Sequence, residues 1–343
     1  MHMIWKYIFR PFLFLFDPET AHHITLDGLK MICKIPGVKS IIKLFYSFQN
    51  KIGIIELFGL KFKNPVGLAA GLDKDGKYIE ELALFGFSHI EIGTVTPKPQ
   101  GGNPKPRLFR LLNDQALINR MGFNNEGVVA MVECLKKLNK PADLILGINI
   151  GKNKDTPLEN AADDYLKCFE ALHLYADYFT INISSPNTPG LRGLQEREPL
   201  INLLSQMGTA NKLINKPILV KIAPDLDDDQ LLEIKEIILA QGMNGIIMGN
   251  TTLDRSTLKT GDAILNTIGA GGLSGVPLQH KSNDRLVALT QMPGRIPLIG
   301  VGGIMCEESA KDKLTQGAGL IQVYTGFIYN GPGLIKRICK SLQ

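Results

Sequence analysis

The amino-acid sequence predicts an α/β protein whose main body is one (β/α)8 barrel, preceded by a helical N-terminal extension. From residue 65 onward, eight short apolar segments recur, and each ends in small or polar residues. Helical patterns separate these segments, and no linker interrupts the series of about 280 residues. Eight units in unbroken succession favour a closed barrel over an open, doubly wound sheet.

The individual elements follow from the period of the apolar residues. The expected strands are residues 66–70, 90–94, 144–151, 179–185, 218–223, 245–250, 298–304 and 320–325. The expected helices are residues 77–84, 125–138, 163–175, 199–213, 228–241, 283–291 and 306–315. A strand pair at 52–57 and 60–63, which turns at Phe58-Gly59, is expected at the barrel base. This order of elements is that of a TIM barrel.

The sequence predicts three parts: a helical arm (residues 1–40), a connector with the strand pair (41–64) and the catalytic barrel (65–343). Residues 3–16 are apolar except for Lys6, Arg10 and Pro11. This segment is shorter than the roughly 20 apolar residues that cross a bilayer. Its aromatic residues and two cations suit a helix that lies on the membrane surface.

A second arm helix is expected to begin at Asp17, an N-cap residue followed by Pro18 and the first-turn acid Glu19. Two short helices with apolar faces form an open-sided pocket if the faces meet only in part. The alternative is that the arm packs on its own barrel or on a partner chain. The helix is expected to end before Pro36-Gly37.

The net charge of +5 lies mostly in the arm. Residues 1–52 carry seven Lys or Arg against three Asp or Glu, which is +4 and leaves +1 for the rest of the chain. Cations among long apolar residues predict peripheral contact with anionic lipid. Nucleic acid is a poor partner for such a segment, because dense arginine clusters are missing.

Cysteine and histidine usage argues against a metal site or a disulfide framework. The five cysteines are scattered without a CxxC pair, and the six histidines show no metal-ligand spacing. We therefore expect no metal. Without a recognisable signal peptide, a reducing cytoplasmic compartment is the simplest expectation.

Polar residues at the strand ends define the candidate site, because the catalytic site of a β/α barrel lies at the carboxyl ends of its strands. Residues 178–193 are the clearest case, a strand that runs into the turn sequence Ser184-Ser185-Pro186. An ordinary polar loop is the alternative. The other strand ends bring Ala70, Gly71, Asp73, Lys74, Thr94, Asn149, Asn182, Lys221, Asn250, Thr251, Tyr324 and Thr325. Amides, hydroxyls and two lysines suit a planar, anionic, carbonyl-rich ligand.

Glycines near the last two strands predict a phosphate site. Residues 300–303 and Thr325-Gly326 expose backbone N–H groups near helix starts, and barrels often bind phosphate there. The glycine-rich run at 269–275 adds a further loop. Each glycine pair alone favours a tight turn over a phosphate contact, but together, at this position in the barrel, they favour the phosphate.

Lys221 admits two kinds of chemistry. A lysine at a strand end can form a Schiff base, as in a lyase, or can act as a fixed cation beside a flavin ring. The neighbouring amides of Asn149 and Asn182 favour the flavin. A lysine that only caps a strand end in solvent is the remaining alternative.

Several long motifs resemble the class 2, quinone-dependent dihydroorotate dehydrogenases, in particular the bacterial members. The resemblance covers essentially the whole chain, including the arm. The matching motifs are LAAGLDKDG (68–76), EIGTVTPKPQ (91–100), NRMGFNN (119–125), INIGKNKDTP (148–157), INISSPNTPGLR (181–192), VKIAPD (220–225), NTTLDR (250–255), GGLSG (271–275) and GVGGI (300–304).

The resemblance implies a cofactor, a substrate and a base. FMN would be bound by Ala70, Gly71, Lys74, Thr94, Asn149, Asn182, Lys221 and Gly249, with its phosphate at Gly275, Gly303, Tyr324 and Thr325. Dihydroorotate would be bound by Lys74, Asn119, Arg120, Met121, Gly122, Phe123, Asn182, Asn187, Asn250 and Thr251. Ser185 matches the catalytic base, for which a relay through Thr188 or a buried water is our hypothesis. Gly249 stands where many relatives have threonine, so a flavin contact through the backbone would survive there and one through the hydroxyl would be lost.

The implied reaction is oxidation of (S)-dihydroorotate to orotate, with FMN as hydride acceptor and a membrane quinone as final acceptor, in de novo pyrimidine synthesis. The arm would admit the quinone, and the protein would lie peripherally on the cytoplasmic face of the bacterial inner membrane. One alternative is the same chemistry with a soluble acceptor, fumarate or NAD. A Schiff-base lyase that uses Lys221 and a non-catalytic membrane-surface binding protein are more distant alternatives.

Overall fold

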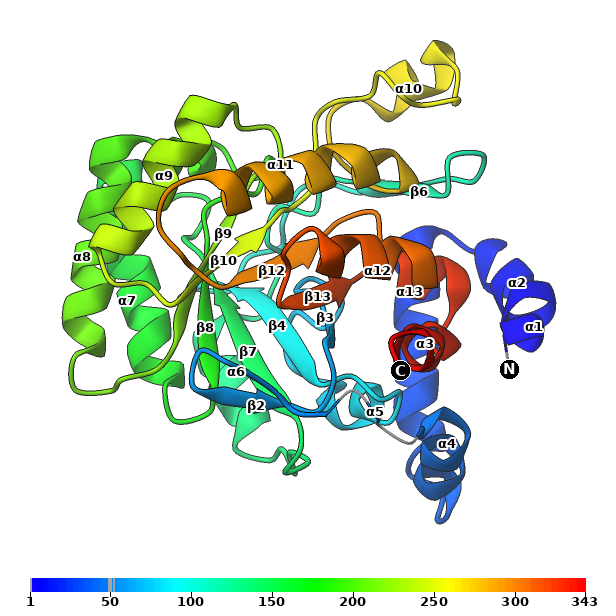
Figure 1. The fold of residues 1–343 in the computed structure, drawn as a ribbon. Helices are drawn as coiled ribbons and strands as arrows, with labels where there is room; N and C mark the ends of the chain where they lie inside the picture. The colour runs from blue at the N-terminus through cyan, green and yellow to red at the C-terminus, as the bar shows by residue number, and fades with distance from the viewer. Residues whose placement is uncertain (1, 49–50, 52) are drawn as a thin grey trace.

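The expected barrel is present in the computed structural model, which describes residues 2–48, 51 and 53–343 (Figure 1). Within this part of the chain, eight parallel strands close in the order β10-β12-β13-β3-β4-β7-β8-β9. Their bounds are β3 (Val66–Leu68), β4 (His89–Val95), β7 (Ile145–Ile150), β8 (Tyr178–Asn182), β9 (Ile218–Ile222), β10 (Gly245–Met248), β12 (Leu298–Val301) and β13 (Leu320–Val323). Each strand pairs with its successor, and β13 pairs with β3 to close the ring. The predicted fold class is therefore confirmed.

Helices surround the barrel, and each expected helix overlaps an observed one. They are α5 (Ile79–Ala83), α6 (Gly127–Leu135), α7 (Ala161–Leu172), α8 (Arg197–Asn211), α9 (Asp228–Ala240), α11 (Gln279–Gln291) and α12 (Glu307–Thr315). The clearest start is that of α9, where Asp227 and Gln230 form a reciprocal capping box. The sequence reasoning missed α10 (Asp262–Ile268), α13 (Thr325–Asn330) and α14 (Gly333–Ser341).

A three-stranded antiparallel sheet beside the barrel was also missed. It consists of β5 (Leu108–Leu111), β6 (Ala116–Asn119) and β11 (Gly272–Gly275), in the order β11-β6-β5. Each strand has four residues, and β11 joins the other two from more than 150 positions away along the chain. Strands this short carry too little alternation to be recognised from pattern alone.

The strand pair before the barrel is present as β1 (Ile55–Leu57) and β2 (Leu60–Phe62); residue 52 of the expected strand lies outside the described residues. Phe62 is fully buried and packs with Leu219, Ile247 and Ile299 from the barrel strands. The pair therefore covers the amino-terminal end of the barrel and leaves the opposite end for a ligand.

The N-terminal segment forms α1 (His2–Ile4), a π-helical turn η1 (Trp5–Phe9), α2 (Arg10–Phe14), α3 (Pro18–Ile32) and α4 (Val38–Tyr46), which lie to one side of the barrel (Figure 1). As expected, Asp17 caps α3: its Oδ1 accepts hydrogen bonds from the backbone N–H groups of Glu19 and Thr20 at 3.0 and 3.1 Å. Helix α4 was not expected, and it crosses the predicted boundary at residue 40. None of the described helices is both long and apolar enough to span a bilayer.

Glu19 joins the arm to the barrel. Its carboxylate accepts two hydrogen bonds from Arg107, at 3.1 Å from Nε and 2.7 Å from Nη2, and both side chains are over 90% buried. Burial raises the pKa of Glu19, but the hydrogen bonds and charge of Arg107 lower it more, so the net shift is downward. A paired, bidentate contact of this kind fixes orientation as well as distance. The arm is therefore held in one place on the barrel by a charged contact.

His89 is a buried histidine near the closed end of the barrel. Its ring is fully buried, lies against Phe62 and shares a 2.9 Å hydrogen bond between Nδ1 and Ser88 Oγ. Gly67 makes room for it, since a Cβ at that position would lie 2.0 Å from His89 Nε2. Burial lowers the pKa of His89 from 6.5 to about 3.

This burial predicts a specific loss of stability in acid. Between pH 6.5 and about 3 the unfolded chain protonates His89 and the native chain does not, so stability falls as the pH falls. From pH 7 to pH 5 the wild type should lose about 2 kcal/mol of unfolding free energy that a His89→Gln variant does not lose. Urea unfolding at both pH values measures the difference. Equal losses in the two proteins would contradict the assignment, and substitution of the exposed His23 is the control.

Candidate active site

A cavity with about 1010 Å³ of empty space opens at the carboxyl ends of the barrel strands. The structure brings most of the predicted site residues to its wall. Those that line it are Ala70, Gly71, Lys74, Thr94, Asn119, Met121, Gly122, Phe123, Asn182, Ser185, Asn187, Lys221, Asn250, Thr251, Gly275, Gly303, Tyr324 and Thr325. Residues up to 255 positions apart in the sequence thus face one space.

A buried carboxylate, Glu91 on β4, forms the floor beneath this cavity. It is fully buried, and its two oxygens accept hydrogen bonds from four side chains on β7, β8 and β13. The donors are Asn149 Nδ2 at 2.8 Å, Tyr178 OH at 3.2 Å, Thr180 Oγ1 at 3.1 Å and Gln322 Nε2 at 2.9 Å. Buried charges persist when they are fully hydrogen-bonded and paired. Glu91 is the first residue of the motif EIGTVTPKPQ (91–100), but it was not predicted as a site residue.

Lys221 supplies the opposite charge. Its Nζ lies 3.8 Å from Glu91 Oε1, and the two side chains are 5% and 0% exposed. Burial lowers the pKa of the Lys221 ammonium, and the negative charge of Glu91 opposes this by raising it. The pair thus brings a cation to the cavity wall with its counterion beneath it.

Asn149 lies behind the cavity wall and does not line it. Its amide is fully buried: Oδ1 accepts from Thr94 Oγ1 at 2.5 Å and from Asn182 Nδ2 at 3.1 Å, while Nδ2 donates to Glu91. Asn149 therefore connects the carboxylate at the floor to two side chains that do face the cavity. Its predicted contact with the cofactor stays a prediction.

Lys74 is the second ammonium group of the cavity. Its Nζ donates a 2.6 Å hydrogen bond to Asn124 Oδ1. Burial, and after it the charge of Arg107, lower the pKa of Lys74 to about 7. A bound anion beside Nζ would favour the charged form. Lys74 therefore suits recognition of a carboxylate or another acidic group.

The glycines predicted to bind phosphate form one corner of the cavity. Gly275 and Gly303 have φ angles of +103° and +73°, and a Cβ on Gly303 would lie 2.3 Å from the Cα of Gln279. Ser274 Oγ and Thr325 Oγ1 are hydrogen-bonded at 2.8 Å beside them. Bare backbone and hydroxyls at this end of a barrel suit a phosphate group.

Ser185 also lines the cavity and is 6% exposed. Its Oγ accepts a 3.3 Å hydrogen bond from the backbone N–H of Asn187. No direct hydrogen bond joins Ser185 to Thr188, since the Thr188 hydroxyl is buried and has no hydrogen-bond partner among the described residues, and the relay stays a hypothesis. The Ser185 hydroxyl thus faces the cavity with its proton uncommitted to any side chain in the described residues.

Two predicted residues lie away from the cavity. The guanidinium of Arg120 donates to the carbonyls of Ile268 and Ala270 and stacks on Phe109, so it fixes a neighbouring loop instead of facing a substrate. Gly249 is buried beside Pro224, where a Cβ would make only a 3.4 Å contact. Neither residue lines the cavity, and the predicted ligand contacts of both stay predictions.

Other residues of the cavity wall had no strong signal in the sequence. Gln322 on β13 and Ser274 on β11 line the cavity together with the apolar Leu278, Val301 and Met305. Ser274 stands inside the quoted GGLSG motif, and Gln322 is the polar residue within an otherwise apolar strand. A polar residue inside a buried strand is the signal that could have identified Gln322.

A second cavity, with about 660 Å³ of empty space, lies between the arm and the barrel. Its wall is mostly apolar and includes Trp5, Leu13, Phe14, Ala21, His22, Leu26, Arg110 and Phe327. Tyr324 lines both cavities. Burial lowers the pKa of His22 to about 4, so the imidazole is neutral at pH 7. The open-sided pocket expected of the arm is therefore observed, with the barrel as one of its walls.

Comparison with known proteins gives one consistent result. The family model described as dihydroorotate dehydrogenase matches residues 54–343. A dihydroorotate dehydrogenase (quinone) from Christiangramia forsetii is 53% identical over 342 residues, which cover 99% of this chain and 98% of the relative. One from Escherichia fergusonii is 48% identical, with 97% and 98% covered. The crystal structure of the Eimeria tenella enzyme in complex with ferulenol is 35% identical, with a TM-score of 0.85 over 95% of this chain and 90% of that chain.

The glycine corner generates a test of phosphate binding. A Gly303→Ala variant must displace the backbone at a position with φ +73°, because its Cβ would overlap Gln279. Loss of charge-assisted hydrogen bonds to a phosphate should weaken FMN binding by about 10- to 100-fold. Fluorescence titration of the flavin-free protein with FMN measures this affinity.

The matched control is Gly261→Ala, where a Cβ would meet nothing within 4 Å. Its FMN affinity should equal that of the wild type. Undiminished affinity in Gly303→Ala would show that the phosphate binds elsewhere.

Proposed function

The chain belongs to the dihydroorotate dehydrogenase family, and from this premise we propose that its flavin is FMN, bound in the cavity at the barrel mouth. The protein is a quinone-dependent flavoenzyme that oxidises dihydroorotate to orotate in pyrimidine biosynthesis. The observation that carries the assignment of the site is that Ser185, Lys74 and Lys221 line the same cavity as Gly275 and Gly303.

The residues present fit FMN. The glycine corner offers backbone groups to a phosphate, and Lys221 offers a buried cation to the ring system. Gln322 Oε1 and Thr251 Oγ1 line the cavity, are buried and lack a hydrogen-bond partner among the described residues. Buried polar atoms of this kind await a ligand or water. We assign the ring to Ala70, Gly71, Thr94, Asn182 and Lys221, and the phosphate to Gly275, Gly303 and Thr325.

The chain's own residues bind the substrate and move one proton. Lys74 and the amides of Asn119, Asn187 and Asn250 offer one ammonium and several donors to an anionic, carbonyl-rich ring. We propose that Ser185 Oγ accepts the proton from the substrate carbon that is next to a carbonyl while the serine's own O–H proton passes to a water molecule, because no side chain of the described residues accepts it. When bound, FMN supplies the acceptor for the hydride that leaves the adjacent carbon. The uncommitted hydroxyl of Ser185 faces the cavity, as this role requires.

We assign the arm cavity to the quinone. Its wall is mostly apolar, it includes the neutral His22 and the cationic Arg110, and it shares Tyr324 with the flavin cavity. A soluble acceptor such as fumarate or NAD would not need an apolar pocket of this kind. The alternative function, a lyase that uses Lys221 as a Schiff base, is not supported, because the matching family is one of dehydrogenases.

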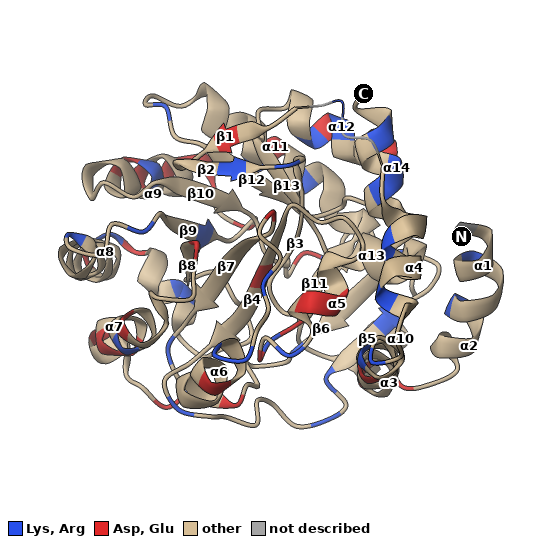
Figure 2. Cartoon of the chain, turned by 90° about the horizontal axis from the view of Figure 1, so that it is seen from below, with Lys and Arg blue, Asp and Glu red and all other residues tan. Residues whose placement is uncertain are grey.

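The outer face of the arm suits a membrane surface. Helices α1 and α2 carry few charged residues (Figure 2), and Lys6 and Arg10 are the cations among exposed apolar side chains. The exposed large apolar residues of the N-terminal helices include Met3, Ile4, Tyr7, Ile8, Phe9, Phe12, Leu15, Phe16, Met31, Ile32, Ile41, Leu44 and Phe45. A patch of this size with flanking lysines indicates peripheral attachment to anionic lipid. We place the protein on the cytoplasmic face of the cell membrane.

The function and the base are tested together by anaerobic reduction. The purified wild type should be yellow, should bleach with dihydroorotate and should regain its colour with a quinone. A Ser185→Ala variant should keep its FMN and bleach about 100- to 10,000-fold more slowly, because general base catalysis contributes that much. Stopped-flow absorbance measures both rates.

The two claims can fail separately. A wild type that dihydroorotate does not bleach would refute the proposed function. A Ser185→Ala variant that bleaches at the wild-type rate across the pH range would refute only the role of the serine.

The arm cavity generates a prediction for the second half-reaction. An Ala21→Phe substitution fills a cavity whose wall includes the buried Ala21, so a hydrophobic quinone should reoxidise the enzyme at least about 10-fold more slowly. Bleaching by dihydroorotate should stay unchanged. Ile24→Phe, at a position 43% exposed on the same helix, is the matched control. Undiminished reoxidation in Ala21→Phe would place the quinone elsewhere.

A further inference from the structure

Three loops hold the residues that face the substrate side of the cavity. The loop after β8 carries Ser185 and Asn187, and the loop after β10 carries Asn250 and Thr251. The loop after β9 lies between them and begins with Ala223, Pro224 and Asp225. Because each loop comes from a different strand, their relative position depends on contacts between the loops.

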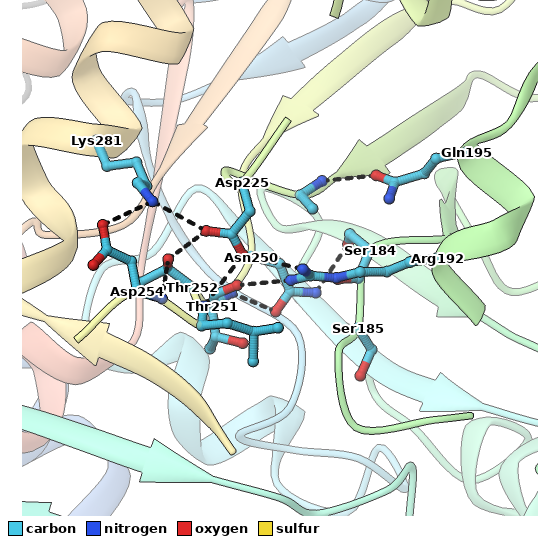
Figure 3. Close-up of polar contacts among 12 residues, drawn as sticks. Ser184, Ser185, Arg192, Gln195, Asp225, Asn250, Thr251, Thr252, Asp254 and Lys281 are labelled. Carbon is cyan, nitrogen blue, oxygen red and sulfur yellow. Dashed lines mark hydrogen bonds and ion pairs between the residues drawn. The ribbon is translucent and has the colours of Figure 1, made fainter. Parts of the chain in front are cut away.

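Arg192 makes one hydrogen bond to each of these loops (Figure 3). Its Nε donates to the carbonyl of Ser184 at 3.2 Å, Nη1 to Asp225 Oδ2 at 3.1 Å and Nη2 to the carbonyl of Thr251 at 3.3 Å. The carbonyls belong to the residue before Ser185 and to a predicted substrate ligand. A planar guanidinium can aim three bonds in fixed directions, which an ammonium cannot.

Asp225 fixes Arg192 from the other side. Its Oδ2 also accepts the backbone N–H of Leu253 at 3.2 Å, and its Oδ1 accepts from Thr252 Oγ1 and, at 3.4 Å, from Lys281 Nζ. Lys281 comes from α11 and also pairs with Asp254 at 2.9 Å. The carboxylate is therefore bound to the loop after β10 and to a barrel helix at the same time.

Neither charged group reaches the cavity. Arg192 and Asp225 are absent from its wall, and their side chains are 25% and 20% exposed. The nearest cavity residues are connected to them through the chain, and Asn250 Nδ2 further links the loops by a 2.9 Å bond to Ser184 Oγ. Any effect of Arg192 on the reaction must therefore pass through the position of Ser185 and Thr251.

We propose that Arg192, held by Asp225, is a positioning residue that sets the Ser185 loop against the Asn250-Thr251 loop for binding of the substrate ring. The inference rests on the proposed function and adds a determinant of substrate affinity that lies outside the cavity. The proposal rests on the observation that the Arg192 guanidinium is hydrogen-bonded to all three loops. Misplacement of a base by about 1 Å can cost about 100-fold in rate.

The test uses Arg192→Lys and Asp225→Asn in the full-length, FMN-loaded protein. Orotate affinity is measured from the change in flavin absorbance when orotate binds. The rate at which dihydroorotate bleaches the flavin is measured by stopped-flow absorbance. We expect wild-type FMN content, about 10-fold weaker orotate binding and about 10- to 100-fold slower bleaching. Reoxidation by quinone should be unchanged, since the arm cavity is remote from the three loops.

Two further measurements distinguish a positioning role of Arg192 from a purely structural one. In Arg192→Ala, added guanidinium ion should restore part of the orotate affinity, because it can occupy the vacated site beside Asp225. Amide hydrogen exchange of residues 184–192 should accelerate in Arg192→Lys while exchange in the barrel strands stays unchanged. The matched control is Arg197→Lys, since Arg197 is 57% exposed and pairs with Glu233 on the surface.

The outcomes decide the proposal. Wild-type orotate affinity and bleaching in both Arg192→Lys and Asp225→Asn would overturn it. A loss of FMN or of folding that parallels the loss of rate would make the pair structural and would overturn it as well. Because the wild type is measured beside the variants, failure of the proposed function would appear separately, as a wild type that dihydroorotate does not bleach.

Discussion

The structure depends on a negative charge in the middle of the barrel. Glu91 is fully buried, and an isolated carboxylate there would be strongly unfavourable. Four hydrogen-bond donors and the Lys221 ammonium offset the cost of burying this carboxylate, and these groups come from β7, β8, β9 and β13. The requirement to satisfy one carboxylate thus fixes side chains from five of the barrel strands, β4 included. Through Asn149 the same network reaches Thr94 and Asn182, which face the ligand.

The two cavities give the enzyme a polar entrance and an apolar one. The cavity at the barrel mouth contains amides, hydroxyls and ammonium groups, whereas the arm cavity is lined mainly by apolar side chains. Tyr324 lies in the wall between them, and the Glu19–Arg107 pair holds the arm in the position that forms the second cavity. In the proposed function, the polar substrate uses the cavity at the barrel mouth and the apolar quinone uses the arm cavity.

The sequence predicted the barrel and most of the cavity wall because both have local signals. Each barrel strand is an apolar run that ends in polar or glycine residues, and those ends converge by geometry alone. The β5–β6–β11 sheet, Glu91 and the Arg192–Asp225 pair were missed for a common reason: their significance arises from partners far away in the chain. The same reason explains why Arg120, inside a recognisable motif, turns away from the cavity to bind the loop at Ile268.

We expect the Glu91 carboxylate to affect the flavin site through its ion pair with Lys221. A double-mutant cycle on FMN affinity tests it most directly, with flavin-free wild type, Glu91→Gln, Lys221→Met and the double variant titrated with FMN. Glu91→Gln should weaken FMN binding when Lys221 is present. It should change FMN binding little in the Lys221→Met background. The same loss in both backgrounds would contradict it, because the carboxylate would then affect the flavin site independently of the lysine.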